Sequence, residues 1–248
     1  MKNKISKLKG ISIVIPVFNE GTNIINLINE IEKVMQDLLP FEILVVDDGS
    51  TDNTFRYLRK KSKTSKTLKI LRHSKNYGQS VGLRSGIIEA KEDYILTLDG
   101  DGQNNPKDII KLLKLYNEKK PFLLLIGNRI KRNDSKIRKL VSRVAFYVRK
   151  LVFNDNTPDT GCAIKMFRRK EFLQLPFFNH IHRFFPIMFK SYGGEIISIP
   201  VDHRNRMSGH SKYTNLQRAA VGLYDLIGVL WLRKRTTLPN IYKNNKLT

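Results

Sequence analysis

The sequence predicts an α/β fold with a mostly parallel central sheet, and two observations support this class. First, short β-branched apolar runs alternate with segments of helical periodicity from residue 11 to residue 126. Second, polar turns follow the apolar runs, as expected for strands joined by right-handed helical crossovers. The chain has 248 residues, of which 41% are apolar, so it is long enough to bury a substantial core.

Each element of this first part has a local reason. The run 11–17 is β-branched and almost wholly apolar, which is typical of a strand buried on both faces of a sheet. Segment 51–63 has an acidic start and a basic end that suit a helix dipole, and Pro106 falls near the first turn of another helix. We expect strands at 11–17, 41–46, 68–72, 94–98 and 123–126, and helices at 24–38, 51–63, 81–90 and 106–118.

After Gly127 the alternation changes. We expect a basic amphipathic helix at 135–153, a loop at 154–161, strands at 163–167 and 196–201 with a helix at 184–192 between them, and a polar basic loop at 204–213. A last helix is expected at about 216–232. No internal repeat or low-complexity linker interrupts the chain, so we expect one domain over residues 8–213. An amphipathic helix at 214–235 and a disordered tail at 236–248 would follow it.

The formal net charge of +23 predicts an anionic partner: nucleic acid, an acidic lipid surface or a phosphorylated substrate. Residues 129–150 carry nine Lys or Arg against one Asp. Cys162 is the only cysteine, so no intrachain disulfide is possible and a reducing compartment is expected. We expect neither a cleaved signal peptide, because Pro16 interrupts the first apolar run, nor a segment of the length needed to span a bilayer.

Acidic turns follow three of the predicted strands, and the most informative is Asp99-Gly-Asp101-Gly-Gln103. Two carboxylates one residue apart, with an amide oxygen two residues further on, form a compact oxygen cluster that suits Mg²⁺ or Mn²⁺. Asn19-Glu20 and Asp47-Asp48 occupy the corresponding position after the first two strands, where α/β sheets bind ligands. A solvated acidic loop is the alternative for any one of these turns.

Several segments together resemble the family-2 nucleotide-sugar glycosyltransferases, in particular their dolichol-phosphate mannosyltransferase and polyprenyl-phosphate glycosyltransferase branch. The matching segments appear in the family's order over residues 12–213, and they are 13–20 (IVIPVFNE), 45–52 (VVDDGSTD), 76–78 (NYG), 98–103 (LDGDGQ), 127–129 (GNR), 159–162 (DTGC), 182–185 (HRFF) and 206–213 (RMSGHSKY). The resemblance implies a GT-A fold, in which a Rossmann-like sheet binds the nucleotide and the last third of the domain forms the acceptor side.

The resemblance also implies roles on the donor side. Pro16 and Glu20 would belong to the nucleotide cradle, and Asp47 would hydrogen-bond the base or ribose. Asp99, Asp101 and Gln103 would hold the divalent metal, Mg²⁺ or Mn²⁺, that binds the donor diphosphate. For Asp47 an Asx turn before the next helix is the alternative, and Asp48 is the better candidate for that cap.

On the acceptor side, residues 179–188 contain no acid that could serve as the base needed by hydroxyl acceptors. A phosphate monoester is largely ionised at neutral pH and can attack without a base, so the site must supply cations. The resemblance assigns the acceptor phosphate to Arg129, Arg143, Arg206, Ser211 and Lys212. It makes Asp101, Arg129, Arg206 and Lys212 the residues on which transfer depends.

These points predict an inverting hexosyltransferase of dolichol-phosphate mannosyltransferase type. It would use GDP-mannose or a UDP-hexose as donor and polyprenyl phosphate (dolichyl or undecaprenyl) as acceptor. We expect it in the cytoplasm, peripheral at the inner face of the membrane and held by its basic and amphipathic helices. The helix 214–235 could instead pack on the domain or bind a membrane protein. Alternatives are transfer to a sugar or lipid hydroxyl in envelope polysaccharide assembly, an inactive scaffold, or a nucleic-acid-binding module, although no nucleic-acid partner is expected.

Overall fold

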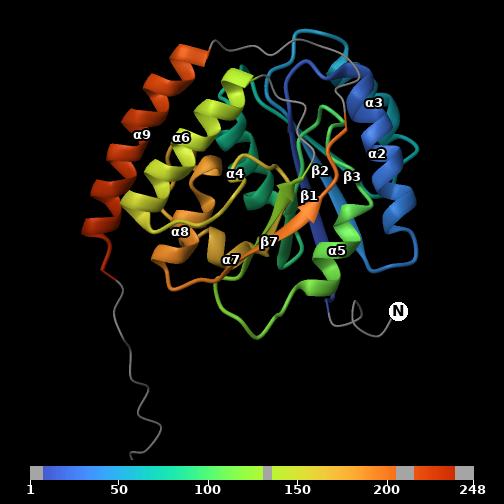
Figure 1. Ribbon diagram of the computed structural model, residues 1–248. Helices are drawn as coiled ribbons and strands as arrows, with labels where there is room; N and C mark the ends of the chain where they lie inside the picture. The colour runs from blue at the N-terminus through green and yellow to red at the C-terminus, as the bar shows by residue number, and fades with distance from the viewer. Residues whose placement is uncertain (1–7, 131–135, 205–214, 238–248) are drawn as a thin grey trace, which may run out of the picture. The chain divides into compact units, whose positions relative to one another are not determined.

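The computed structural model describes residues 8–130, 136–204 and 215–237, and the chain divides into two compact units, residues 1–212 and 213–248. The first unit is built on a sheet that is flanked by helices (Figure 1). The sheet has seven strands in the order β3-β2-β1-β4-β6-β5-β7. Its strands are β1 (Ile11–Val17), β2 (Phe41–Asp47), β3 (Leu68–Arg72), β4 (Tyr94–Thr97), β5 (Leu124–Arg129), β6 (Lys165–Arg168) and β7 (Ile196–Val201). Its helices are α2 (Gly21–Met35), α3 (Thr54–Ser62), α4 (Gln79–Glu89), α5 (Asp108–Leu115), α6 (Lys136–Phe153), α7 (Arg169–Phe172), the 3₁₀ turn η1 (Ile181–Arg183) and α8 (Phe185–Ser191).

The sheet is mostly parallel, which confirms the predicted fold class. β1 pairs in parallel with β2 and β4, β2 with β3, and β5 with β7. Among the described strands, only β6 runs antiparallel, and it is inserted between β4 and β5. This insertion brings the segment around Lys165 into the centre of the sheet, where β6 pairs with the strand that leads to Asp99.

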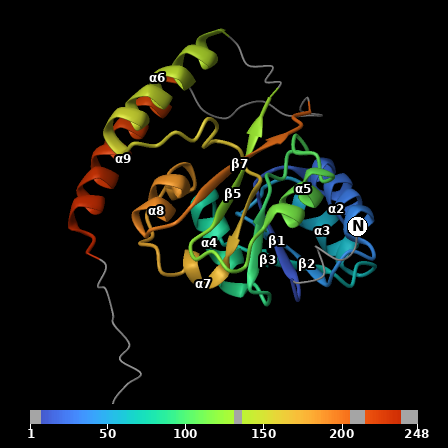
Figure 2. The same ribbon diagram turned by 60° about the horizontal axis from the view of Figure 1, so that its bottom comes forward.

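Helices cover both faces of the sheet (Figure 2). On one face, Ile13 of β1 shares a buried core with Ile28 of α2, Leu58 of α3 and Leu112 of α5. On the other face α4 packs so closely that a Cβ added at Gly86 would lie 2.4 Å from Cγ1 of Val14. The alternating side chains of one buried strand therefore fix a helix layer on each side.

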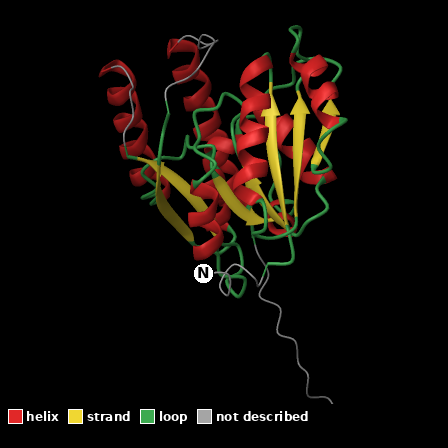
Figure 3. Ribbon diagram, turned by 90° about the vertical axis from the view of Figure 1, so that its right-hand side faces the viewer, coloured by secondary structure: helices red, strands yellow, loops and turns green. Residues whose placement is uncertain are grey.

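The carboxyl ends of the parallel strands meet at one edge (Figure 3). Val17 at the end of β1 is in register with Asp47 at the end of β2, and Val14 of β1 is in register with Thr97, the last residue of β4. The turns that carry Glu20, Asp47 and Asp99 therefore emerge on the same side of the sheet, as their positions after the strands predict.

The second unit contains α9 (Asn215–Arg235), which is longer than the predicted helix 216–232. Tyr224, Ile227 and Trp231 are exposed at helical spacing, and the helix ends in the basic run Arg233–Arg235. In the described residues, none of the helices combines the length and the apolar character required to cross a bilayer. Most of the tail predicted to be disordered, at 236–248, lies outside the described residues.

Candidate active site

The predicted metal motif lies in the turn after β4, and its two carboxylates interact electrostatically. The Asp99 carboxylate accepts a hydrogen bond from Nε2 of Gln79 at 2.7 Å, and Oδ1 of Asp101 accepts one from the backbone N–H of Gln103 at 3.1 Å. Burial, and then the charge of Asp101, raise the pKa of Asp99 to about 7. Glu20 adds to this effect, so its carboxylate also acts on the metal motif.

The third predicted ligand, Gln103, is tied to the segment after β7. Its Nε2 lies 3.4 Å from both Nε2 of His203 and the carbonyl oxygen of Arg204, and its own carbonyl accepts a hydrogen bond from the Arg204 N–H at 2.9 Å. The motif therefore lies beside His203 and Arg204, the last residues described before position 205. The acceptor residues predicted after that position, Arg206, Ser211 and Lys212, are outside the described residues.

Asp99 and Asp101 fit a hard divalent cation, because two like-charged carboxylates held together are stabilised by a positive ion between them. In the described parts of the chain, no group of three or more His, Cys, Asp or Glu side chains is arranged to hold a metal. A cation here would therefore need oxygen from the Gln103 amide, water or a substrate phosphate to complete its shell.

The residues predicted for the donor side have internal partners. Asp47 is fully buried, with Oδ1 accepting the Ser50 N–H at 3.0 Å and Oδ2 3.3 Å from Nε of Arg72. Asp47 thus bonds to the third residue after it and not to the start of α3 at Thr54, so it does not form the predicted Asx cap. Its contact with a nucleotide stays a prediction. Glu20 accepts a hydrogen bond from Nδ2 of Asn23 at 3.0 Å. Pro16 lies in β1 and packs against α4. A Cβ added at Gly82 of that helix would be 2.9 Å from the Cβ of Pro16.

The prediction that Asp48 caps the helix after β2 is wrong. At the start of α3 the carboxylate of Asp52, not that of Asp48, accepts the backbone N–H and the hydroxyl of Thr54. Asp48 instead accepts hydrogen bonds from His73 and from the loop that follows β3. Sequence spacing alone does not distinguish the two acids, because the partners of Asp48 are 25 or more residues away.

Arg129, at the end of β5, is held in place by Asp159. Its Nε and Nη2 donate to the two carboxylate oxygens at 2.6 and 2.8 Å, which is a bidentate pair. Burial opposes the charged form, but the hydrogen bonds to Asp159 raise the pKa of the guanidinium above its ordinary value. Arg143, predicted as a second acceptor ligand, is an exposed residue of α6.

A cavity of about 130 Å³ opens beside Asp99. Its lining includes three side chains to which we assigned no function from the sequence: Gln79, Lys165 and Arg183. His182, the first residue of the segment 182–185 that carried part of the family resemblance, also lines it. All four follow or belong to motifs that carried the family resemblance. The sequence therefore pointed to these segments, but it did not show that these side chains line a cavity.

Lys165 and His182 give this cavity an unusual polar wall. Lys165 is only 4% exposed, donates to the Cys162 carbonyl oxygen, and lies 5.6 Å from the ring centre of Phe185. Burial lowers its pKa. Nδ1 of His182 is 2.7 Å from Oγ of Ser80, and burial lowers the pKa of this histidine well below its usual value, which keeps it neutral at pH 7.

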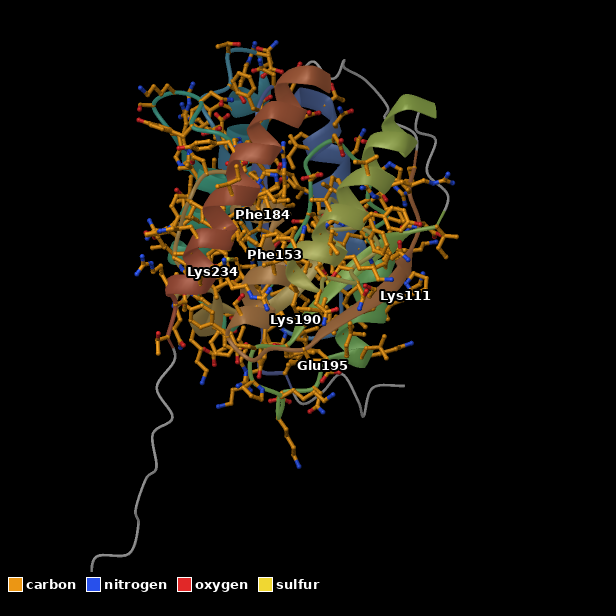
Figure 4. The ribbon with its side chains drawn as sticks, turned by 60° about the vertical axis from the view of Figure 1, so that its left-hand side comes forward. Lys111, Phe153, Phe184, Lys190, Glu195 and Lys234 are labelled. Carbon is orange, nitrogen blue, oxygen red and sulfur yellow. The ribbon has the colours of Figure 1, made fainter. Side chains whose placement is uncertain are left out.

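A second cavity, of about 330 Å³, lies at the start of β7 and is lined by Asp155, Lys190 and Glu195. Figure 4 labels Lys190 and Glu195 among the side chains of this region. Glu195 comes immediately before β7, whereas the carboxylate motifs come after the parallel strands. None of the predicted site residues lines this second cavity.

The mostly parallel sheet with helices on both faces is similar to the fold of GT-A glycosyltransferases. The sequence model of Glycosyl transferase family 2 matches residues 12–175, and the chain belongs to that family. It is 31% identical over 234 residues to a dodecaprenyl-phosphate galacturonate synthase of Rhizobium johnstonii, covering 92% of this chain and 69% of the relative. It is 30% identical over 230 residues to an undecaprenyl-phosphate 4-deoxy-4-formamido-L-arabinose transferase of Serratia proteamaculans, covering 92% and 70%.

Solved structures confirm the fold. A glucosyl-3-phosphoglycerate synthase of Mycobacterium tuberculosis, in complex with Mn²⁺, uridine diphosphate and glucosyl-3-phosphoglycerate, superposes with a TM-score of 0.65. The match covers 92% of this chain and 81% of that protein at 18% identity. At this identity the likeness establishes the shared architecture. It does not assign roles to individual residues.

Proposed function

We propose that this glycosyltransferase moves a hexose of mannose or glucose type from a nucleotide diphosphate donor, GDP-mannose or a UDP-hexose, to polyprenyl phosphate with inversion at the anomeric carbon. Two relatives that are at least 30% identical are named as transferases or synthases that act with a polyprenyl phosphate. The observation that carries the proposal is the Asp99 and Asp101 pair at the carboxyl edge of the sheet, with Arg129 and Lys165 acting on the same group.

Asp99, Asp101 and Gln103 would hold the divalent cation, Mg²⁺ or Mn²⁺. The cation would neutralise the charge that develops on the diphosphate as it leaves. A glycosyltransferase structure of the same fold contains Mn²⁺ and uridine diphosphate, which supports this assignment. Pro16, Glu20 and Asp47, after neighbouring strands, would border the nucleotide.

The basic residues at this edge of the sheet, Arg129 and Lys165, suit an anionic nucleophile. A phosphate oxygen of the acceptor would form a bond to the anomeric carbon as the bond from that carbon to the diphosphate breaks, and the electron pair leaves with the nucleoside diphosphate. No proton has to move, which agrees with the lack of an acid in residues 179–188. Arg129, fixed by Asp159, would orient the acceptor phosphate, together with Arg143, Arg206, Ser211 and Lys212.

We also place the enzyme at the inner, cytoplasmic face of a membrane, because its acceptor is a lipid. The basic helix α6 and the exposed apolar and basic side chains of α9 support contact with an anionic lipid surface. A membrane protein is an alternative partner for the same side chains.

The test is transfer from radiolabelled donors to polyprenyl phosphate by wild-type protein and by Asp101→Asn, with exposed Asp93→Asn as the matched control. We expect a lipid product that mild acid releases, loss of at least about a hundredfold in rate for Asp101→Asn, and no change for the control. Full turnover by Asp101→Asn would contradict the metal assignment. A product stable to mild acid would instead identify a hydroxyl acceptor.

A further inference from the structure

Asp48 is a buried carboxylate outside the metal motif that organises the loop after β3. It is 3% exposed. It accepts hydrogen bonds from Nδ1 of His73 at 2.7 Å, from the backbone N–H of Tyr77 at 3.0 Å and from that of Gly78 at 2.7 Å. Because a carboxylate has no hydrogen to donate, Nδ1 of His73 is the donor in this pair. A single side chain after β2 thus holds both ends of the loop 73–78.

His73 extends this network into α4. Its Nε2 lies 2.9 Å from Oγ of Ser85, in the second turn of the helix. The order Asp48–His73–Ser85 resembles the triad of serine hydrolases, but Ser85 is inside a helix, where backbone N–H groups bond to helix carbonyls and cannot form an oxyanion hole. The geometry therefore suits positioning, not nucleophilic attack.

The element that the network holds is the first turn of α4, which contacts the active site twice. Gly78 precedes the helix with a φ of +93°, a conformation that favours glycine. The next residue, Gln79, donates from Nε2 to the Asp99 carboxylate at 2.7 Å, and Ser80 contacts Nδ1 of His182 at 2.7 Å. A shift of this turn would therefore change the position of a predicted metal ligand and of the cavity wall together.

We propose that Asp48, His73 and Ser85 are positioning residues for the transfer reaction, which fix the first turn of α4 so that Gln79 orients Asp99. This inference rests on the proposed function insofar as Asp99 binds the cation. Residues that orient a metal ligand typically change metal affinity by 10- to 100-fold when they are replaced. The hydrogen bonds described for this network run to the loop 73–78 and to α4, which carries Gln79, so it should act on the donor side of the site.

The test measures Mn²⁺ affinity of the full chain by electron paramagnetic resonance of the free ion, in a graded series of variants. His73→Leu removes both hydrogen bonds and should weaken Mn²⁺ binding about tenfold or more. His73→Asn retains a donor toward Asp48, and Ser85→Ala removes only the outer bond, so both should lose less. Ser191→Ala is the control, because its hydroxyl donates to the carbonyl oxygen of Ile187 in its own helix. Equal affinity in the wild type and all three network variants would overturn the proposal.

A double-mutant cycle then distinguishes positioning through Gln79 from general destabilisation. Gln79→Ala removes the bond to Asp99 directly, so adding His73→Leu to it should cause little further loss of Mn²⁺ affinity. Independent, multiplying losses would overturn the proposal. In metal-free protein, hydrogen exchange at the amides of Tyr77 and Gly78 should accelerate in His73→Leu, and unchanged exchange would also overturn it.

The proposed function is tested separately by Asp101→Asn in the same titration. If Asp101→Asn binds Mn²⁺ like the wild type, the metal site itself is wrong, and with it the positioning inference. If Asp101→Asn loses Mn²⁺ while the network variants retain it, the metal site stands and only the positioning inference fails.

Discussion

Asp99→Asn should stabilise the metal-free protein at pH 8 while it removes a metal ligand. In the folded chain, burial and the charge of Asp101 raise the pKa of Asp99 from 3.8 to about 7. Between these values the folded state binds more protons at this site than the unfolded state, so stability falls as the pH rises from about 4 to 7. Above pH 7 the ionised Asp99 lowers the stability of the folded state by the full amount. Asparagine carries no charge and avoids this loss.

A rise of the Asp99 pKa from 3.8 to about 7 corresponds to at most about 4 kcal/mol in the free energy of unfolding. Because Asp99 is only half-buried, water screens part of this, and we expect a gain of about 1 to 2 kcal/mol at pH 8. Oδ1 of asparagine can still accept the hydrogen bond from Gln79, so the substitution tests the charge alone. The gain should shrink towards zero near pH 4.

Urea unfolding in excess EDTA at pH 5 and pH 8 measures this gain in the free energy of unfolding. Asp93→Asn, at an exposed position, is the control. An Asp99→Asn gain that is larger at pH 8 than at pH 5, against a flat control, supports the reasoning. A variant that is less stable than the wild type at pH 8 would show that the carboxylate pair is not under repulsion.

Two further substitutions test the site and the fold. Asp159→Asn should leave the guanidinium of Arg129 without its bidentate partner, which should cost about 3 kcal/mol in urea unfolding and raise the KM for the acceptor. The control is Asp155→Asn, which breaks a similar ion pair with Arg149 outside the site. It should lower stability and leave the KM unchanged. Gly86→Ala should cost about 1 to 3 kcal/mol, because its Cβ would overlap Val14 of the sheet. Gly228→Ala should be neutral or slightly stabilising in the same assay, because no atom of the described residues lies within 4 Å of an added Cβ there. Equal effects of either pair would contradict the assigned contacts.

The sequence predicted most of the fold because the local signals agreed with one another. The run 11–17 is β1 to the residue, and strands 41–46 and 68–72 differ from β2 and β3 by at most one residue. Their turns place Glu20, Asp47 and Asp99 at one edge, since parallel strands share a carboxyl edge. These features depend on hydrophobic periodicity and on chain direction, both of which can be read from short segments.

The features that were missed depend on contacts between distant segments. The antiparallel direction of β6 brings Lys165 beside Thr97, 68 residues earlier in register, and no local pattern encodes that pairing. Likewise, the contact of His182 with Ser80 joins segments 102 residues apart. The four-residue α7 and the 3₁₀ turn were missed because such short elements have little periodicity of their own.

The order of the strands gives a physical argument for the proposed anionic acceptor. Along the carboxyl edge, acidic residues follow β1 and β4 at Glu20 and Asp99, whereas Arg129 and Lys165 lie in the neighbouring β5 and β6. The charge therefore changes sign between β4 and β6. A donor diphosphate with its cation suits the acidic half, and a second phosphate suits the basic half. A neutral hydroxyl acceptor would gain little from the buried Lys165 and the partly buried Arg129 and would still need a base, so these cations support the proposed phosphate acceptor.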